Sequence, residues 1–303
     1  MAGKHSKSFF DFTKNVYAPK LSSKQTFNTL SLPFKIIISV LVISLVLSSV
    51  IVGGIFMQSN AHKKLLLNAK KSFYSGESSE SLKILAEKNS DIVGWLKVDG
   101  TNIDCAVCQN KNNSFYTNHN QLGKKSRYGA LFLQSGDNFK RKGNDKNIVI
   151  FGNNMKDGTM FGSLKKYRNL NFYKNNPCVN LYYGDEKETY IIFAVMLVSS
   201  SANDEEVYKP YKSHFMNKNN FNSWRDETLS RSLIVSPVEV NYEDELLTLV
   251  TVADDFEGAR LVVMAKKLYE WDASHTDVSE ASVNPKTKYP KIWYTTRGLK
   301  YPH

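Results

Sequence analysis

The stretch that decides the fold is LLTLVTVADDFEGARLVVMAKK, residues 246–267. Two apolar runs rich in β-branched residues, 246–252 and 260–267, flank an acidic turn, and this pattern predicts two neighbouring antiparallel strands. Arg260 stands at the start of the second strand and Val252 at the end of the first. The role of Arg260 is the first question, because Val252 across the turn has no reactive atom.

Further strands are predicted from apolar runs on the N-terminal side of this pair. Each run is short and bounded by Gly, Asn or Asp, and such spacing favours a mostly antiparallel β-barrel or sandwich. Two segments instead have helical character, FGSLKKYRNL at 161–170 and NKNNFNSWRDETLSRS at 217–232. The predicted strands that precede the deciding pair are 94–99, 102–108, 130–134, 147–151, 178–183 and 188–199.

The positive charge of the chain is concentrated near its N-terminus. The formal net charge is +11 over 303 residues, but residues 1–71 hold ten lysines and one acid, Asp11. Residues 72–303 carry 30 basic and 28 acidic groups and are therefore nearly neutral. A nucleic-acid-binding domain would carry its basic groups on the folded part, so we expect no nucleic-acid partner.

The basic segment surrounds an uncharged run of 22 residues, IIISVLVISLVLSSVIVGGIFM at 36–57. As a helix this run would extend about 33 Å, against a hydrocarbon core of about 30 Å. A cleaved signal peptide has a shorter apolar core, of about 7–15 residues, so we interpret the run as a transmembrane anchor. Lysines flank it on both sides, and their distribution does not decide its orientation.

The chain is expected to comprise five parts. Residues 62–90 predict one or two short helices, with Ser79 as a capping residue, and the residues after about 270 are polar, turn-rich and expected to be peripheral. The expected parts are a basic N-terminal segment 1–35, a transmembrane anchor 36–57, a helical linker 58–90, a β-barrel domain 91–269 and a polar C-terminal tail 270–303.

Three cysteines, Cys105, Cys108 and Cys178, provide no disulfide framework. Cys105 and Cys108 form a C-x-x-C, but NIDCAVCQ reads as a strand, on which residues three apart point to opposite faces. A shared metal or a bond between them is therefore not expected, and we predict packed thiols. We expect no metal site and no cofactor.

Three long segments carry a specific resemblance, NSDIVGWLKVDGTNID, NIVIFGNNMKDGTMFGSLKKY and LLTLVTVADDFEGARLVV, which occur in that order. With the smaller signature SFYTNHN at 114–120, they resemble class B sortases, the membrane-anchored cysteine transpeptidases of Gram-positive bacteria. The resemblance covers residues 80–269. It implies an eight-stranded β-barrel with peripheral helices, a cytoplasmic N-terminus and an extracellular domain.

The resemblance also implies three catalytic positions, a cysteine, a histidine and an arginine. The cysteine of that family attacks the substrate carbonyl, the histidine protonates the leaving amine, and the arginine steadies the oxyanion or positions the substrate. Here the arginine is retained as Arg260, whereas Val252 stands at the cysteine position and Asn153 at the histidine position. The resemblance further implies that Thr251 and Arg260 bind substrate.

Neither replacement offers the missing chemistry, because valine has no nucleophilic atom and asparagine exchanges no proton near neutral pH. We interpret Val252 as a packing residue at a strand end and Asn153 as a turn residue that tolerates loop dihedrals. Two roles remain open for Arg260, a surface ion pair with Asp254 or Asp255, or retained binding of a substrate carbonyl.

The C-terminal tail contains NPKTK, in which Asn284, Pro285, Lys286 and Thr287 match an N-P-x-T type of sorting motif. Two interpretations remain open, a chance match in a turn-rich tail and a tethered pseudosubstrate in the peptide groove, favoured by high effective concentration.

The expected function is that of a membrane-anchored, extracellular, catalytically inactive class B sortase homologue. Its partners would be the membrane and either sorting-signal peptides of surface proteins or an active sortase, and its role would be to assist cell-wall protein anchoring. The alternative is an active cysteine transpeptidase that cleaves an N-P-x-T motif and joins it to the cell wall or a pilin. That alternative needs Cys105, Cys108 or Cys178 near Arg260. A wall-binding module that merely inherited the fold is the third possibility.

Overall fold

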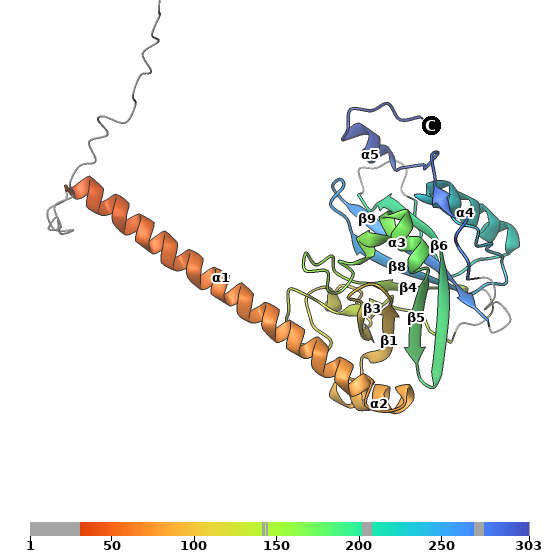
Figure 1. The fold of residues 1–303 in the computed structure, drawn as a ribbon, viewed down its shortest axis with the longest axis horizontal. Helices are drawn as coiled ribbons and strands as arrows, with labels where there is room; N and C mark the ends of the chain where they lie inside the picture. The colour runs from red at the N-terminus through yellow and green to blue at the C-terminus, as the bar shows by residue number, and fades with distance from the viewer. Residues whose placement is uncertain (1–30, 141–142, 144, 202–207, 270–275, 303) are drawn as a thin grey trace, which may run out of the picture. The chain divides into compact units, whose positions relative to one another are not determined.

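The structure, a computed structural model, describes residues 31–140, 143, 145–201, 208–269 and 276–302 (Figure 1). Contacts divide the chain into two units, residues 1–61 and 62–303. The two ends of the chain, 1–30 and 303, lie outside the described residues.

Helix α1 (Leu32–Phe73) is continuous over 42 residues and includes the uncharged run. It is long and apolar enough to cross a membrane, a property that N-terminal signal sequences share, and its most apolar part is exposed. The next helix, α2 (Ser78–Lys88), begins two residues earlier than a cap at Ser79 would allow. The predicted Ser79 cap is therefore wrong. Its N-cap position is occupied by Glu77, whose side chain makes no capping hydrogen bond.

Eight strands form a closed barrel in the order β1-β2-β3-β4-β8-β9-β6-β5, and β5 pairs with β1 to close it. Neighbouring strands are antiparallel except β2 with β3 and β4 with β8. The predicted barrel is confirmed. The strands are β1 (Ile92–Val98), β2 (Asp104–Gln109), β3 (Leu131–Leu133), β4 (Asn147–Phe151), β5 (Cys178–Tyr183), β6 (Glu186–Ser199), β8 (Leu246–Val252) and β9 (Ala259–Leu268).

Alternation along the strands divides their side chains between the barrel interior and two outer clusters. Within β8, Leu247 and Leu249 belong to the interior cluster, whereas Leu246 and Val250 belong to an outer one. Helix α4 (Lys218–Arg231) covers that outer face and contributes Phe221 and Trp224. Both faces of β8 are thus buried, which explains why 246–252 reads as a continuous apolar run.

The second outer cluster lies over β1, β2 and β3. Phe73 of α1 stacks on Trp95 of β1 with ring centroids 4.3 Å apart, and Leu82 and Leu85 of α2 join the same cluster. The last turns of α1 therefore pack on the barrel as part of unit 62–303.

The predicted helix 161–170 is replaced by two shorter pieces. A 3₁₀ helix, η3 (Leu164–Arg168), is followed by α3 (Leu170–Asn175), whose cap residue Asn169 accepts a hydrogen bond from the backbone of Phe172. A similar 3₁₀ turn, η2 (Phe115–Thr117), lies in the SFYTNHN segment.

The described part of the C-terminal segment lies at the surface of the domain and is packed against it. Strand β10 (Ser282–Val283) pairs with β7 (Ile234–Val235), and a short helix α5 (Lys291–Thr295) follows. Val278 and Ala281 are buried in the interior cluster. Their few apolar side chains were not enough to reveal this packing in the sequence pattern.

Candidate active-site pocket at the ends of β4, β8 and β9

The barrel brings the three candidate positions to one end of neighbouring strands. Val252 and Arg260 are direct partners in the β8–β9 pair, and Asn153 follows the end of β4, which runs parallel to β8. All three residues line one pocket of about 330 Å³. We call it the Arg260 pocket. Its lining residues are Asn113, Ser114, Thr117, Phe132, Phe151, Gly152, Asn153, Val250, Thr251, Val252 and Arg260.

Val252 is not a core residue, contrary to the sequence interpretation. Its side chain is 45% exposed, whereas Val250, two residues earlier on the same strand face, is 1% exposed. The exposure arises because β8 ends here and its last side chain faces the pocket rather than a packed cluster. Position 252 is therefore open to a ligand, and its side chain presents only methyl groups.

Asn153 has a structural role that differs from the predicted one. Its side-chain amide donates hydrogen bonds to the backbone carbonyls of Thr117 (2.8 Å) and Tyr128 (3.2 Å). Met160 is the only described residue other than glycine with a positive φ, so Asn153 is not required for a left-handed turn. Its amide instead ties the end of β4 to the loop that carries η2.

Arg260 is free of the predicted ion pairs. Asp255 accepts two hydrogen bonds from Arg168, at 2.7 and 3.1 Å, and among the described residues no carboxylate pairs with Arg260. The Arg260 guanidinium donates instead to the carbonyl of its neighbour Ala259, at 3.0 Å. Arg260 lines the pocket together with Val252, and its guanidinium has further N–H donors, which suit a carbonyl acceptor.

Thr251 points to the other face of β8 from Val252. Its side chain is 3% exposed, and its hydroxyl donates to the carbonyl of Gly152 at 2.8 Å. The hydroxyl is thus already used within the fold to join β8 to the segment after β4.

No cysteine lines the Arg260 pocket. Cys105 belongs to the interior cluster and Cys108 to the outer cluster over β1–β3, so the two thiols lie on opposite faces of β2, as predicted. Cys178 begins β5, which is not adjacent to β8 or β9. Burial raises the pKa of the Cys105 thiol to about 12 and raises the pKa values of Cys108 and Cys178. The thiols are therefore protonated at neutral pH, and the thiol is a poor nucleophile.

The described histidines are also engaged away from the pocket. His119 stacks on Phe115 and its Nδ1 lies 2.8 Å from the carbonyl of Phe115, while His214 lies 2.9 Å from Asp145. In the described part of the chain, no group of three or more His, Cys, Asp or Glu side chains is placed to hold a metal ion. His5, His275 and His303 lie outside the described residues.

His62, near the end of α1, predicts a specific pH dependence of stability. It is 5% exposed, it stacks on Tyr128 at 4.0 Å, and neither ring nitrogen has a hydrogen-bond partner. Burial lowers the pKa of His62 to about 4, an effect that nearby Asp157 only partly opposes. The folded state thus favours the neutral ring, while the unfolded chain binds a proton below about pH 6.5. The stability of the fold should therefore fall between pH 6.5 and pH 4.

The test compares the detergent-solubilised full chain with a His62→Phe variant, which keeps the aromatic stack but cannot titrate. Between pH 7.5 and pH 5.0 the wild type should lose on the order of 1–2 kcal/mol more stability than the variant. Thermal unfolding would show this as an additional Tm decrease of several degrees. An equal decrease for both proteins would contradict the assignment.

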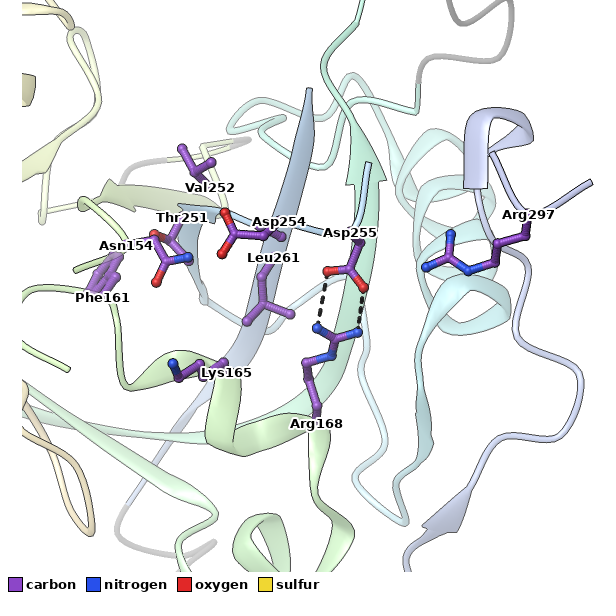
Figure 2. Close-up of a pocket in the computed structure, with 11 residues that line it drawn as sticks. Asn154, Phe161, Lys165, Arg168, Thr251, Val252, Asp254, Asp255, Leu261 and Arg297 are labelled. Carbon is purple, nitrogen blue, oxygen red and sulfur yellow. Dashed lines mark hydrogen bonds and ion pairs between the residues drawn. The ribbon is translucent and has the colours of Figure 1, made fainter. Parts of the chain in front are cut away.

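A second pocket, of about 370 Å³ and lined by charged side chains, adjoins the first at Thr251 and Val252. We call it the Arg297 pocket, and Figure 2 shows its side chains. Its lining residues are Asn154, Phe161, Lys165, Arg168, Thr251, Val252, Ala253, Asp254, Asp255, Leu261 and Arg297. The Arg168–Asp255 pair joins residues 87 apart in the chain, so no local sequence signal could have indicated it.

The NPKTK segment does not lie in either pocket. Asn284 and Thr287 both donate side-chain hydrogen bonds to the carbonyl of Ser232, at 2.8 and 3.1 Å. Pro285 and Lys286 line neither pocket. The segment is engaged beside β7 instead, and we do not propose it as a pseudosubstrate.

Comparisons with known proteins identify the relatives of this fold. No protein-family model matches the chain. Sortase B of Listeria monocytogenes is 30% identical over 226 residues, which cover 70% of this chain and 88% of the relative. The X-ray structure of a mutant form of Clostridium perfringens sortase B has a TM-score of 0.62 and 36% identity, covering 68% of this chain and 98% of that one.

The Staphylococcus aureus sortase B–substrate complex matches with a TM-score of 0.63 and 25% identity, over 71% of this chain and 99% of that one. The chain thus resembles sortase B proteins both in its barrel fold and in its sequence, over nearly the whole length of these relatives. On these grounds the chain belongs to the class B sortase family.

Proposed function

We propose that this protein is a membrane-anchored, extracellular member of the class B sortases that binds sorting-signal peptides without catalysing acyl transfer. Its sortase-type character is supported by the fold and by its relatives. The proposed absence of catalysis depends on one observation above all. Val252 is 45% exposed in the Arg260 pocket, at the position where the family resemblance places the nucleophile.

The loss of two catalytic groups would lower the rate of acyl transfer by many orders of magnitude. An acyl intermediate requires a nucleophilic atom, and removal of the nucleophile in a serine protease lowers kcat by about a millionfold. A proton donor contributes a further factor of about 10² to 10⁴. Asn153 supplies no proton, because a side-chain amide is not an acid near neutral pH, and its N–H groups already donate to the carbonyls of Thr117 and Tyr128. With both groups replaced, binding is the activity that the remaining pocket supports.

Peptide binding is supported by what the pocket retains. Arg260 keeps donors without a carboxylate partner among the described residues, and Phe132, Phe151 and Val250 supply apolar lining. Pockets that combine apolar walls with a few polar groups are typical ligand sites. A related sortase B structure contains its substrate, and by this resemblance we assign a sorting-signal peptide of the N-P-x-T type to the Arg260 pocket.

The membrane anchor is proposed from α1, whose uncharged run 36–57 is long enough to cross a bilayer. The family resemblance places the preceding basic residues 1–35 in the cytoplasm and the barrel outside. In this arrangement the protein would hold sorting signals, or assist an active sortase, at the extracellular face of the cell membrane, where wall proteins are anchored.

The test of peptide binding measures the affinity of the full chain in detergent for a labelled N-P-x-T peptide. Arg260→Ala should weaken binding about tenfold or more, because a charge-assisted hydrogen bond contributes about 1.5–3 kcal/mol. Lys187→Ala is the matched control, because Lys187 is exposed at the start of β6 and lines neither pocket. Equal affinities for the wild type and Arg260→Ala would favour a wall-binding module that uses another surface.

A further inference from the structure

The C-terminal segment is firmly attached to the barrel before it reaches the pockets. Beside the β10–β7 pair, the backbone of Lys288 donates to the carbonyl of Ser230 at 2.9 Å, and the Lys288 ammonium pairs with Glu227 at 3.1 Å. The Asn284 and Thr287 side chains add their bonds to Ser232. The chain that continues toward α5 therefore starts from a fixed point on the domain.

Further along, the same segment contributes Arg297 to the lining of the Arg297 pocket. Tyr289 stacks on Trp293 with ring centroids 4.0 Å apart, and both side chains pack partly buried against the interior cluster. The Arg297 guanidinium lies 4.3 Å from the Trp293 ring centroid, and its Nη1 donates to the Trp293 carbonyl at 3.0 Å. A cation held over an indole face is fixed in position without being neutralised. Arg297 is thus oriented by Trp293 of the preceding helix α5.

Arg297 has donors available for a ligand. Only its Nη1 donates within the described residues, to Trp293 and, at 3.4 Å, to Thr296. Figure 2 shows the guanidinium directed from the C-terminal segment toward the side where Arg168 and Asp255 pair. The Nε and Nη2 edge of a guanidinium matches the two oxygens of a carboxylate.

The charges of this pocket favour an anion. Three cations, Lys165, Arg168 and Arg297, line it together with two carboxylates, Asp254 and Asp255. Arg168 and Asp255 neutralise each other through their two hydrogen bonds. Lys165 and Arg297 have no carboxylate partner in the described part of the chain, and Asp254 offsets only one of them. One positive charge remains for a ligand.

We propose that Arg297 is a specificity-determining residue, which makes the C-terminal segment part of the peptide groove and selects a carboxylate. A peptide held in the Arg260 pocket would cross Val252, which both pockets share, and place its carboxylate against Arg297. The carboxylate is the one at the C-terminal end of the bound peptide. This inference rests on the proposed peptide binding, and it adds that the bound peptide carries a carboxylate which Arg297 recognises.

The experiment uses two synthetic peptides of sequence Asn-Pro-Lys-Thr-Asn, one with a free C-terminal carboxylate and one with a carboxamide. Their affinities for the full chain in detergent are measured by calorimetry at low and moderate salt. The wild type should bind the carboxylate form about tenfold more tightly, and added salt should reduce this preference. Arg297→Gln should abolish the preference, and Arg297→Lys should restore part of it.

Lys286→Gln is the matched control, because Lys286 lies in the same segment, is exposed and lines neither pocket. It should leave both affinities and the preference unchanged. Equal binding of the two peptides by the wild type, or an equal loss for both in Arg297→Gln, would overturn the role of Arg297 while leaving peptide binding intact. Failure of the wild type to bind either peptide would overturn the proposed function, and the role of Arg297 with it.

Discussion

Val252→Cys combined with Asn153→His is expected to convert this protein into a slow, thiol-dependent peptide-cleaving enzyme. Val252 is exposed opposite Arg260 and Asn153 lines the same pocket, so the double variant would place a thiol, an imidazole and a guanidinium together. We expect cleavage of an N-P-x-T peptide on the order of 100-fold above background, the lower range for an acid–base contribution. Mass spectrometry of the products and of the acyl-enzyme is the measurement.

The restored rate should remain far below that of a working transpeptidase. The Asn153 amide donates to two carbonyls, whereas a neutral imidazole has a single N–H donor. The variant therefore loses one hydrogen bond of this loop, at a cost of about 1–3 kcal/mol. Val252→Ser with Asn153→His is the control, because it carries a hydroxyl in place of the thiol and should form no acyl-enzyme. A double variant that binds peptide without cleaving it would contradict a sortase-type geometry in the pocket.

Gly129→Ala should destabilise the protein strongly and abolish peptide binding. Gly129 has a φ of +64°, and a Cβ there would lie 2.6 Å from the Tyr116 carbonyl oxygen, 2.8 Å from the Asn153 amide nitrogen and 2.9 Å from the Thr117 carbonyl oxygen. Two of these contacts are with backbone, so the loop that Asn153 holds would have to move. We expect a loss of about 3 kcal/mol or more in the free energy of unfolding.

Gly123→Ala is the matched control, because Gly123 has a φ of +70° and no atom within 4 Å of a built Cβ. It isolates the cost of the left-handed backbone, which is about 1 kcal/mol for alanine. Urea unfolding of both variants gives the difference between them. Similar losses, or normal peptide binding by Gly129→Ala, would show that the contact of Asn153 with this loop does not shape the pocket.

The sequence predicted the barrel because its strands carry strong local signals. The limits of β4, β5 and β8 agree with the predicted 147–151, 178–183 and 246–252, and the other five barrel strands differ by one or two residues at most of their ends. Their apolar runs are short, rich in β-branched residues and bounded by turn formers, so local pattern and tertiary packing agree. Helix α4, predicted at 217–232, also extends over nearly the expected residues.

The details of the pocket could not be predicted in the same way, because they depend on contacts between distant segments. Val252 continues an apolar strand pattern, yet it is exposed because the strand ends at a pocket. An ion pair of Arg260 with Asp255, one of the roles left open by the sequence, does not form because Arg168 binds that carboxylate. Arg297 reaches the pocket through a segment whose docking depends on hydrogen bonds to Ser232 rather than on an apolar pattern.

The Arg260 pocket remains open although a valine occupies position 252. The side chain at position 252 is not drawn into either hydrophobic cluster, and Arg260 is not neutralised by a neighbouring acid in the described part of the chain. A decayed pocket would be expected to bury exposed methyl groups, since each buried CH₂ contributes about 0.8 kcal/mol. An open pocket lined by Arg260, which has no carboxylate partner among the described residues, is what the proposed peptide binding requires.

The most direct test of the proposed absence of catalysis is the intact mass of the full chain after incubation with a sorting peptide that carries a thiol-trapping group. We predict that the mass of the protein stays unchanged. In a parallel sample, the unmodified peptide should bind reversibly and remain uncleaved. The reason is that Cys105, Cys108 and Cys178 all lie outside the Arg260 pocket. A covalent adduct on any of the three cysteines that depends on Arg260 would contradict the account and identify a working transpeptidase.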